Sequence, residues 1–276
     1  MKKILALLLA MTFCAVCFAG CGSTPEETTS DVNATTAANN SDSDYEYIKA
    51  NGKMVIGITE YEPMNYRDKE TKEWTGFDTE FAQAVAEELG VEAEFKVIDW
   101  DNKELELDAR SIDAVWNGMT LTDEVKKSMS CTDPYVINAQ VVVVRAEDKD
   151  KYATKDVLKD ATFAAEAGSA GAAAIEDTFG TDNLTTVTAQ SDALLEVQSG
   201  AADACVIDIT MATAMTGEGS SYADLTTAME LTSEEYGIGF RLGSDMTEKV
   251  NEIIKDLKAN GKLQELADKY ELTLAE

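Results

Sequence analysis

Two stretches of this sequence place polar groups where an apolar strand is expected to end. The first runs from Ser111 to Glu124 and predicts a strand over Ile112–Trp116, followed by Gly118-Met119-Thr120 and a helix start at Thr122. A Gly-containing turn before a helix N-terminus presents backbone N–H donors to a small anion. Ligands sit at such strand ends in open α/β sheets. Gly118, Met119 and Thr120 are therefore candidate anion-binding residues.

The second stretch repeats this pattern and ends in a carboxylate. Residues 199–208 again contain Asp-Ala, here Asp203-Ala204, followed by an apolar strand that ends at Asp208. An aspartate at a strand end suits a cation, so the two strand ends together could hold a zwitterion. Two alternatives stay open. Asp-Ala before an apolar run can arise by chance, and Asp208 could cap a helix over Ile209–Met215.

The elements that position these residues alternate between strand and helix. Met54–Ile58 is a short apolar run that predicts a buried strand. A helix over 78–89 follows, with Phe77, Phe81, Val85 and Leu89 on one face and Gly90 as its stop. Val91–Val97 alternates between apolar and charged residues and predicts a half-buried strand. This strand–helix–strand order predicts a parallel sheet.

The second half of the chain continues the α/β alternation. Val141–Val144 predicts a buried strand, the charged segment 147–159 a surface turn and helix, and Thr162–Ala165 another strand. Gly168-Ser169-Ala170-Gly171 then leads into a helix over Ala172–Phe179. This small-residue turn can approach a ligand closely. It lacks the Lys-Ser/Thr ending of a phosphate-binding loop, and Ser169 and Ala170 become candidate ligand contacts.

Composition excludes several classes of function. The 276 residues carry 23 Lys+Arg against 52 Asp+Glu, a net charge of −29, so no nucleic-acid partner is expected. The sequence contains no His. Ser-His and Cys-His nucleophile pairs and imidazole metal sites are therefore absent. No catalytic residue, metal site or cofactor is predicted, and the acidic surface is interpreted as a solubility feature.

Residues 1–20 are typical of a secretory leader. Lys2 and Lys3 precede an apolar run that is too short for a transmembrane helix. Phe18-Ala19-Gly20-Cys21 resembles the bacterial lipobox, which predicts cleavage before Cys21 and lipidation of its thiol. Plain cleavage with an incidental Cys21 is the alternative. Residues 21–44 are polar and small, and they predict a flexible tether between a lipid anchor and the folded body.

Only Cys131 and Cys205 belong to the folded body. A disulfide is permitted outside the cytoplasm. Two buried free thiols are favoured, because a bridge would have to join different halves of the molecule.

From residue 45 to 273 the chain resembles the extracytoplasmic solute-binding proteins of polar-amino-acid ABC importers, the bacterial extracellular solute-binding proteins of family 3, in their Gram-positive lipoprotein form. The matching motifs are Thr75-Gly76-Phe77-Asp78, Asp99-Trp100-Asp101, Ile112-Asp113-Ala114, Gly118-Met119-Thr120, Asp133-Pro134-Tyr135, the strand Asp203–Asp208, and Tyr236-Gly237-Ile238-Gly239. No motif is specific alone, but all follow the family's order.

The resemblance implies a two-lobed, type II periplasmic-binding-protein-like α/β fold. Two parallel or mixed sheets with flanking helices are joined by a two-strand hinge. Lobe 1 would comprise residues 45–134 and 238–276, and lobe 2 residues 140–235, with hinges near 135–139 and 236–237. Ligand would be trapped as the lobes close.

The resemblance also implies roles for individual residues. Tyr61 and Trp100 match aromatics that sandwich the ligand, although Trp100 could belong to the core. Gly118 and Thr120 match donors to the α-carboxylate, and Asp208 matches the acceptor of the α-ammonium. The ligand wall would also include Met119, Ser169 and Ala170. Glu166 matches a side-chain contact in some relatives, and Glu60 lies near the mouth.

One position departs from the family pattern. The fifth residue after Thr120 is usually an Arg that grips the carboxylate, and here it is Val125. Loss of a charged hydrogen-bond partner costs about 1.5–3 kcal/mol. The predicted pocket is therefore short of cations and rich in acids, which favours a ligand of net positive charge or one whose carboxylate is weakly held.

The resemblance implies a binding protein without enzymatic activity. It would hold a polar or cationic amino acid, work as a monomer on the outer face of the cell membrane with a palmitate-type lipid anchor, and serve the permease and ATPase of an importer. Two alternatives stay open. One is an enzyme on the same fold, similar to cyclohexadienyl dehydratase, with Glu60, Glu166 or Asp208 as acid–base groups. The other is a receptor domain that signals through a partner polypeptide.

Overall fold

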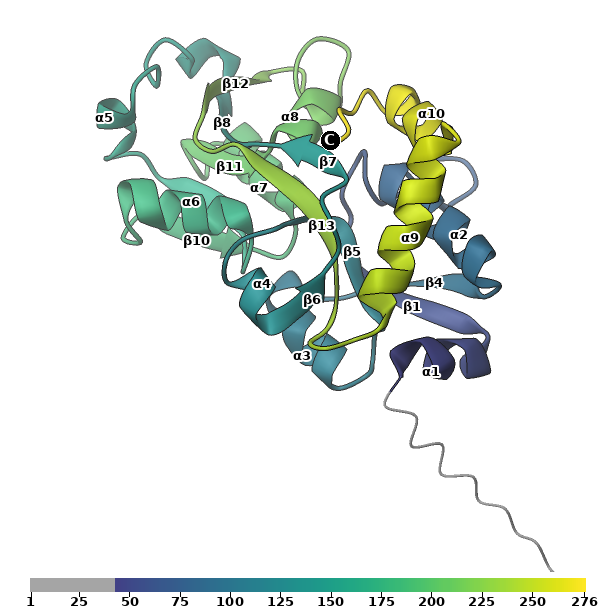
Figure 1. Cartoon of the computed structure of the whole chain (residues 1–276). Coiled ribbons are helices and arrows are strands. Elements are labelled where there is room, and N and C mark those ends of the chain that lie inside the picture. Colours follow the sequence, from purple (N-terminus) through teal and green to yellow (C-terminus); the bar gives the residue numbers. More distant parts are fainter. Residues whose placement is uncertain (1–42) are drawn as a thin grey trace, which may run out of the picture. The chain divides into compact units, whose positions relative to one another are not determined.

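The structure, a computed structural model, describes residues 43–276. The predicted leader and the lipidation residue Cys21 lie outside the described residues. The last residues of the predicted tether, Ser43 and Asp44, start the first helix, α1 (Asp44–Asn51), and the Ser43 hydroxyl accepts the N–H of Glu46. The described part is an α/β structure built around two main sheets (Figure 1).

The first sheet contains the strands of lobe 1. They are β1 (Lys53–Ile58), β4 (Glu92–Val97), β5 (Ala114–Thr120), β6 (Met129–Cys131), β7 (Val136–Asn138) and β13 (Glu234–Arg241). The order is β4-β1-β5-β13-β6, with β7 also paired to β13. β1 runs parallel to β4 and β5, as the alternation of strand and helix predicted, whereas β13 is antiparallel to β5. Strands β2 (Tyr66–Arg67) and β3 (Trp74–Thr75) form a separate antiparallel ribbon.

The second sheet contains the strands of lobe 2. They are β8 (Gln140–Arg145), β9 (Phe163–Glu166), β10 (Leu184–Val187), β11 (Ala204–Asp208) and β12 (Leu225–Glu230). The order is β10-β9-β11-β8-β12. β9 is parallel to β10 and β11, and β8 is antiparallel to β11 and β12. Both sheets are mixed, so the predicted fold class is confirmed.

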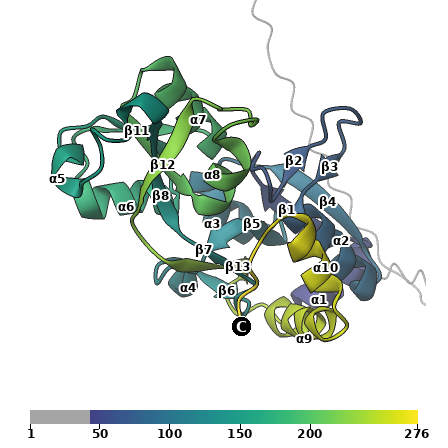
Figure 2. The same ribbon diagram turned by 90° about the horizontal axis from the view of Figure 1, so that it is seen from above.

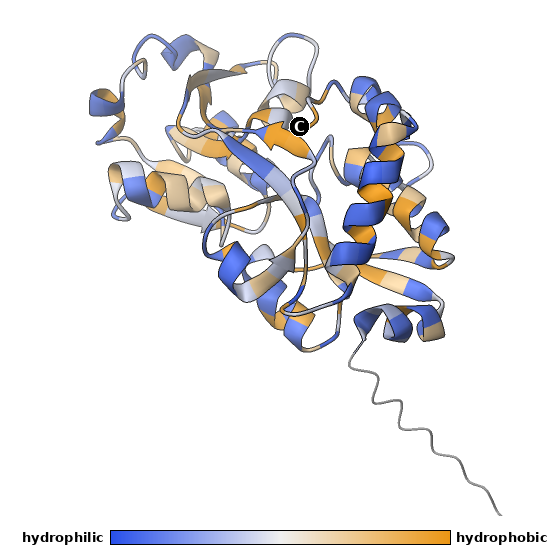
Figure 3. Ribbon diagram, in the orientation of Figure 1, coloured by the Kyte–Doolittle hydropathy of each residue, from blue (hydrophilic) through white to orange (hydrophobic). Residues whose placement is uncertain are grey.

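Helices cover both faces of the first sheet. On one side are α1, α2 (Phe77–Leu89), α9 (Met246–Ala259) and α10 (Lys262–Lys269), and on the other are η1 (Trp100–Asn102), α3 (Lys103–Asp108) and α4 (Val125–Ser128). Strand alternation explains the division. Trp116 of β5 packs in the larger core with Phe81, whereas its neighbour Val115 packs in the smaller core with Leu107. The α9 ribbon alternates between hydrophilic and hydrophobic colours, as expected for a half-buried helix (Figure 3).

The second sheet is covered in the same way by η2 (Ala146–Asp148), α5 (Lys155–Leu158), α6 (Ala170–Phe179), α7 (Gln190–Ser199) and α8 (Ile209–Met215). Cys205 of β11 packs with Leu194 of α7, and the next residue, Val206, packs with Ile175 of α6. Helices α6 and α7 therefore lie on opposite faces of this sheet, which the view from above also shows (Figure 2).

The chain crosses between the two sheets twice, and both crossings are short. Strand β7 is separated from β8 by Ala139 alone, and β12 is separated from β13 by residues 231–233. These crossings lie beside or near the predicted hinges. Tyr236 and Gly237 themselves are inside β13. The lobe boundaries and hinge positions stay a prediction.

The repeated Asp-Ala pair has the same structural role in both sheets. Asp113 precedes β5, and its Oδ2 accepts the backbone N–H of Val55 in the neighbouring β1 at 2.9 Å. Asp203 precedes β11, and its Oδ2 accepts the N–H of Thr162, just before the neighbouring β9, at 2.9 Å. Each carboxylate thus satisfies a backbone donor at the start of a parallel neighbour. The repeated Asp-Ala pair therefore marks the start of a strand in each sheet.

The predicted end of the central strand is wrong. Strand β5 begins at Ala114 and continues through Gly118 to Thr120, where a turn was expected. It continues because β13 pairs with its second half, with Gly237 opposite Met119 and a register shift between Gly237 and Gly239. Gly118 has a φ of +58°, and an added Cβ would lie 2.8 Å from Cε1 of Tyr61. Only glycine suits this irregular pairing.

Two other expectations have clear outcomes. Cys131 and Cys205 are both free thiols, as favoured, but only Cys205 is fully buried, and Cys131 is half-buried. Burial raises the pKa of Cys131 to about 11. The charged segment 147–159 forms the end of η2, a turn and the short helix α5, in agreement with the predicted surface turn and helix. Leu158 is fully buried while Val157 is exposed, so the segment has too little apolar surface to hold a longer helix against the sheet.

A buried cation joins three distant parts of lobe 1. The Arg241 guanidinium donates from Nε to both carboxylate oxygens of Asp44, at 3.0 and 3.1 Å, and from Nη2 to Asp113 at 3.2 Å. Its Nη1 donates to the carbonyls of Leu107 and Ile112. Arg241 therefore connects α1, the end of α3 and the start of β5 to the last strand of the sheet.

We expect Arg241→Gln to lower the free energy of unfolding by about 3–5 kcal/mol, because it leaves buried Asp113 without this cation and leaves Asp44 with only the partly exposed Arg110. Arg110 is the matched control. It also contacts Asp44, at 3.0 Å, but its side chain is 44% exposed. Arg110→Gln should cost at most about 1 kcal/mol. Urea unfolding of both variants measures the difference, and equal losses would contradict the assignment of the Arg241 cluster as the anchor of α1.

Candidate functional site

A cavity of about 780 Å³ lies between the two sheets. Its wall includes strand ends and loops from both lobes. The predicted ligand residues that line it are Trp100, Gly118, Met119, Thr120, Glu166, Ser169, Ala170 and Asp208. Tyr61 and Glu60 do not line it. The volume suits a small organic ligand.

The end of β5 contributes two predicted donors, and both already donate within the protein. The Gly118 N–H donates to Oδ2 of Asp78, on α2, at 2.6 Å. The Thr120 hydroxyl donates to Oε1 of Glu234, on β13, at 2.7 Å. The sequence pattern suggested neither acceptor. Burial raises the pKa of Asp78 to about 7, opposed by its hydrogen bonds from Gly118 and Tyr135.

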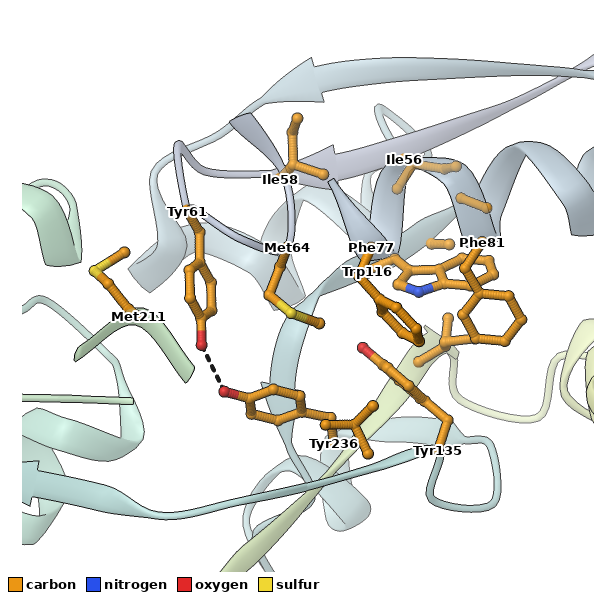
Figure 4. Close-up of a cluster of buried hydrophobic side chains, with 14 of the residues drawn as sticks. Ile56, Ile58, Tyr61, Met64, Phe77, Phe81, Trp116, Tyr135, Met211 and Tyr236 are labelled. Atoms are coloured by element: carbon orange, nitrogen blue, oxygen red, sulfur yellow. Dashed lines mark hydrogen bonds between the residues drawn. The ribbon is translucent and has the colours of Figure 1, made fainter. Parts of the chain in front are cut away.

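Tyr61 lies behind the cavity wall. It is 1% exposed, and its hydroxyl hydrogen-bonds to the hydroxyls of Thr210 and Tyr236. Figure 4 shows its ring pointing toward Tyr236, with Met211 of lobe 2 on the other side. Its ring packs against Gly118. Of the two predicted aromatic residues, only Trp100 therefore lines the cavity. Glu60 is exposed to solvent and does not line the cavity.

Asp208, the last residue of β11, is buried and held by amide donors. Its Oδ1 accepts Gln140 Nε2 at 2.8 Å and also Asn138 Nδ2, and its Oδ2 accepts Gln190 Nε2. Its carboxylate makes no capping hydrogen bond to α8, so the helix-cap alternative is wrong. Burial first, and then the charge of Glu234, raises the pKa of Asp208 to about 7, against the hydrogen bonds that favour the anion.

Glu234 was not predicted as part of the site. Its Oε1 accepts Asn138 Nδ2 and Gln140 Nε2, each at 2.7 Å, in addition to Thr120. Asn138 and Gln140 therefore each donate to both carboxylates and connect Asp208 with Glu234. No spacing in the sequence signals this contact, because Glu234 is separated from Asn138 by 96 positions. The only hint of this role in the sequence was the pair of acidic residues at the start of β13, which is otherwise largely apolar.

Glu166 is the second buried carboxyl group in the cavity wall. It ends β9, is 2% exposed, and its Oε1 has no hydrogen-bond partner among the described residues. Burial first, and then the charge of Asp208, raises the pKa of Glu166 to about 8. The nearby Lys103 partly offsets this increase.

Lys103 is the one cationic residue in the cavity wall. Its Nζ donates to the carbonyls of Trp100 at 3.3 Å and Gly168 at 3.1 Å, and it lies 5.1 Å from the centre of the Trp100 ring. Desolvation lowers the pKa of this amine. The contact to Gly168 joins lobe 1 to the turn before α6 in lobe 2.

The backbone turn before α6 lies very close to Asp101 of lobe 1. Gly168 has a φ of +67°, and an added Cβ would lie 2.6 Å from Oδ1 of Asp101 across the cavity mouth. The Ser169 hydroxyl accepts the Ala172 N–H at 3.1 Å and caps α6, which begins at Ala170 rather than at the predicted Ala172. Ser169 and Ala170 therefore present the positive end of α6 to the cavity.

Val125 occupies the cavity wall at the first position of α4. It is buried in the smaller core of lobe 1, and its N–H donates to the Thr122 hydroxyl at 3.1 Å, so Thr122 caps the helix start as predicted. The wall as a whole contains one lysine and the acidic residues Asp101, Glu104, Glu124, Glu166, Glu176, Asp177 and Asp208. The cavity is strongly acidic.

Other classes of site find no support in residues 43–276. No group of His, Cys, Asp and Glu there could hold a metal ion. None of the helices in the same range is long and apolar enough to cross a membrane.

Two lobes of mixed α/β structure around a ligand-sized cleft define a type II solute-binding fold. Residues 54–273 match bacterial extracellular solute-binding proteins, family 3. The chain belongs to this family.

Individual relatives and solved structures support the same family. The arginine-binding extracellular protein ArtP of Bacillus subtilis is 32% identical over 79% of this chain and 86% of its own. The L-cystine-binding protein TcyJ of Escherichia coli is 28% identical over 81% of this chain and 84% of its own. The crystal structure of AncCDT-1, an ancestral amino acid-binding protein and precursor of cyclohexadienyl dehydratase, has a TM-score of 0.75 and 30% identity, covering 83% of this chain and 99% of that chain.

The buried carboxyl groups predict an unusual pH dependence of stability. The pKa of Glu166 rises from 4.5 to about 8 and that of Asp208 from 3.8 to about 7. The folded state therefore binds more protons than the unfolded state between about pH 4 and pH 8, so the free energy of unfolding falls as pH rises. With about 1.4 kcal/mol per pKa unit, we expect ligand-free protein to lose at least about 2 kcal/mol between pH 5 and pH 8.

Urea unfolding across this pH range measures the effect. The Glu166→Gln variant cannot ionise at position 166. Over this pH range its free energy of unfolding should therefore fall by at least about 1 kcal/mol less than that of the wild type. Glu147→Gln, an exposed position of lobe 2, should keep the wild-type slope. An unchanged slope in Glu166→Gln would show that Glu166 titrates normally in the folded protein.

Proposed function

We propose that this protein is the extracytoplasmic substrate-binding lipoprotein of an ABC importer. It captures a small polar or cationic amino acid between its lobes and delivers it to the permease. The observation that carries the proposal is the cavity between the two sheets, with buried Glu166 and Asp208 in its wall. Family membership and the amino-acid-binding relatives support it.

In this proposal the ligand's ammonium group lies at Asp208, because that carboxylate is already oriented by amide donors and needs a cation to balance its charge. Trp100 and Met119 supply the apolar wall from lobe 1. Ser169 and Ala170 supply the start of α6 from lobe 2. Closure of the lobes around the solute excludes water and strengthens these contacts.

The importer partners are proposed from the family. A binding protein performs no transport by itself, so a permease and an ATPase are its proposed partners. Lipidation at Cys21 would hold it at the outer face of the cell membrane, with residues 22–42 as spacer, and it would work as a monomer. Thus the anchor limits diffusion while the tether allows the lobes to reach the permease.

A second candidate is an enzyme on the same fold. The observation that favours it is Glu166, a buried carboxyl group with a pKa of about 8, which would be protonated and able to act as a general acid at neutral pH. The similarity to AncCDT-1 gives it a structural precedent. Incubation with cyclohexadienyl acids such as arogenate, followed by product analysis, separates the two: turnover supports the enzyme, and binding without turnover supports the transport protein.

The lipid anchor has a direct test. We expect mass spectrometry of membrane-extracted protein to show an N-terminal Cys21 carrying a diacylglyceryl group. Cys21→Ala should appear in the soluble fraction instead. An unmodified N-terminus at any other residue would contradict the anchor.

The ammonium site is tested by Asp208→Asn. A thermal-shift screen of the common amino acids first identifies a ligand, because ligand at a hundred times its dissociation constant adds about 2.7 kcal/mol to stability. Calorimetry should then show about 1.5–3 kcal/mol weaker binding to Asp208→Asn, the value of a charge-assisted hydrogen bond. Glu147→Gln serves as the control with full affinity. Equal affinities for Asp208→Asn and the wild type would exclude Asp208 from ligand contact.

A further inference from the structure

We infer that the cleft selects small organic cations that lack a carboxylate, such as diamines or guanidino-amines, over the amino acids from which decarboxylation would produce them. This inference rests on the proposed function, since it assumes that the cleft captures a solute. It changes only the chemistry of that solute.

The first argument is the state of the donors that could hold a carboxylate. The Gly118 N–H donates to Asp78, and the Thr120 hydroxyl donates to Glu234. The Lys103 ammonium donates to two carbonyl oxygens. A ligand carboxylate would have to compete with an internal acceptor for the Gly118 and Thr120 donors, and Lys103 has only one of its three N–H bonds left for it.

The amide side chains near the site are committed in the same way. Asn138 and Gln140 direct their NH₂ groups at both Asp208 and Glu234, and the Gln190 NH₂ group donates to Asp208. Their orientation is fixed because two carboxylates must be satisfied at once. Asn138 and Gln140 thereby use both N–H bonds of their amides on internal carboxylates, and Gln190 uses one of its two.

The second argument is the acceptor that has no partner. Oε1 of Glu166 is buried in the cavity wall and accepts no hydrogen bond from any described residue. A buried unpaired acceptor is costly, and a ligand N–H donor would satisfy it. Val125 places an apolar side chain in the same wall, so position 125 offers a carboxylate no partner, whereas Glu166 offers a cation an acceptor.

The third argument is the balance of charge. The charge of Asp208 opposes ionisation of Glu166, and among the described residues Lys103 is the only cation in the wall. A ligand with cationic groups at both ends would favour the ionised form of both acids and pair one cationic group with each. The start of α6 is the one feature that attracts an anion, and it carries only about half a unit charge. Seven acidic side chains in the wall outweigh it.

The test uses matched pairs that differ only in the carboxylate: agmatine and L-arginine, cadaverine and L-lysine, putrescine and L-ornithine. Wild-type protein, freed of ligand by unfolding and refolding, is titrated with each compound by calorimetry at one pH and ionic strength. We expect at least one amine to bind, and each amine that binds to have an affinity at least tenfold higher than that of its amino acid.

Two variants locate the selectivity. Glu166→Gln should weaken agmatine binding at least tenfold, whereas the exposed control Glu147→Gln should leave it unchanged. Val125→Arg would add a guanidinium for a carboxylate and should shift the preference toward L-arginine by at least tenfold. Val125→Met, a long apolar side chain at the same position, should not shift it. Unfolding curves confirm that each variant is folded before titration.

The outcomes separate the two proposals. Equal or tighter binding of the amino acid in the pairs overturns the inference and leaves the proposed function standing. Binding of another amino acid, with no binding of any amine, does the same. Absence of binding by all six compounds and by the common amino acids overturns both proposals.

Discussion

The organisation of the cleft depends on how two carboxylates, buried Asp208 and half-buried Glu234, are held where the chain crosses between its sheets. Asn138 ends the strand before the first crossing, Gln140 starts the strand after it, and Glu234 starts the strand after the second crossing. Asn138 and Gln140 donate to both Glu234 and Asp208. A single set of hydrogen bonds therefore ties both crossings to the strand end that lines the cavity. Any movement between the lobes has to occur around these contacts.

The carboxylates of lobe 1 are stabilised differently from those of the cleft. Asp44 and Asp113 share a buried guanidinium, that of Arg241, and they belong to the scaffold. Asp208 and Glu234 have only neutral amide and hydroxyl donors. Neutral donors orient a carboxylate but do not cancel its charge, so the remaining field acts on whatever enters the cleft. A buried acid without an internal cation is a feature of function rather than of stability.

The sequence allowed the fold and much of the cavity wall to be predicted, because both follow from local patterns. Apolar runs predicted the strands. Apolar residues at every fourth position, followed by a glycine, predicted α2. The strand-end rule placed Asp208 at the cleft, and the family resemblance placed Glu166 there. The pattern failed at Gly118, where pairing with β13 extends the strand beyond the expected turn. It also did not reveal that Asp113 and Asp203 each bind a backbone N–H beside a neighbouring strand, because that contact depends on which strands become neighbours in the sheet.

Glu234 shows why the rest of the site was beyond such reasoning. Its partners Asn138, Gln140 and Thr120 come from distant segments, and antiparallel pairing of β13 with β5 and β7 brings them together. The contact with Glu234 also changes the role expected for the Thr120 hydroxyl. A hydroxyl at a strand end suggests a donor for a ligand anion, yet here it donates to an internal anion at the start of the neighbouring strand. In the proposed cation-selective cleft, specificity would therefore depend on which acceptor each donor already holds, and not on the donors that the sequence displays.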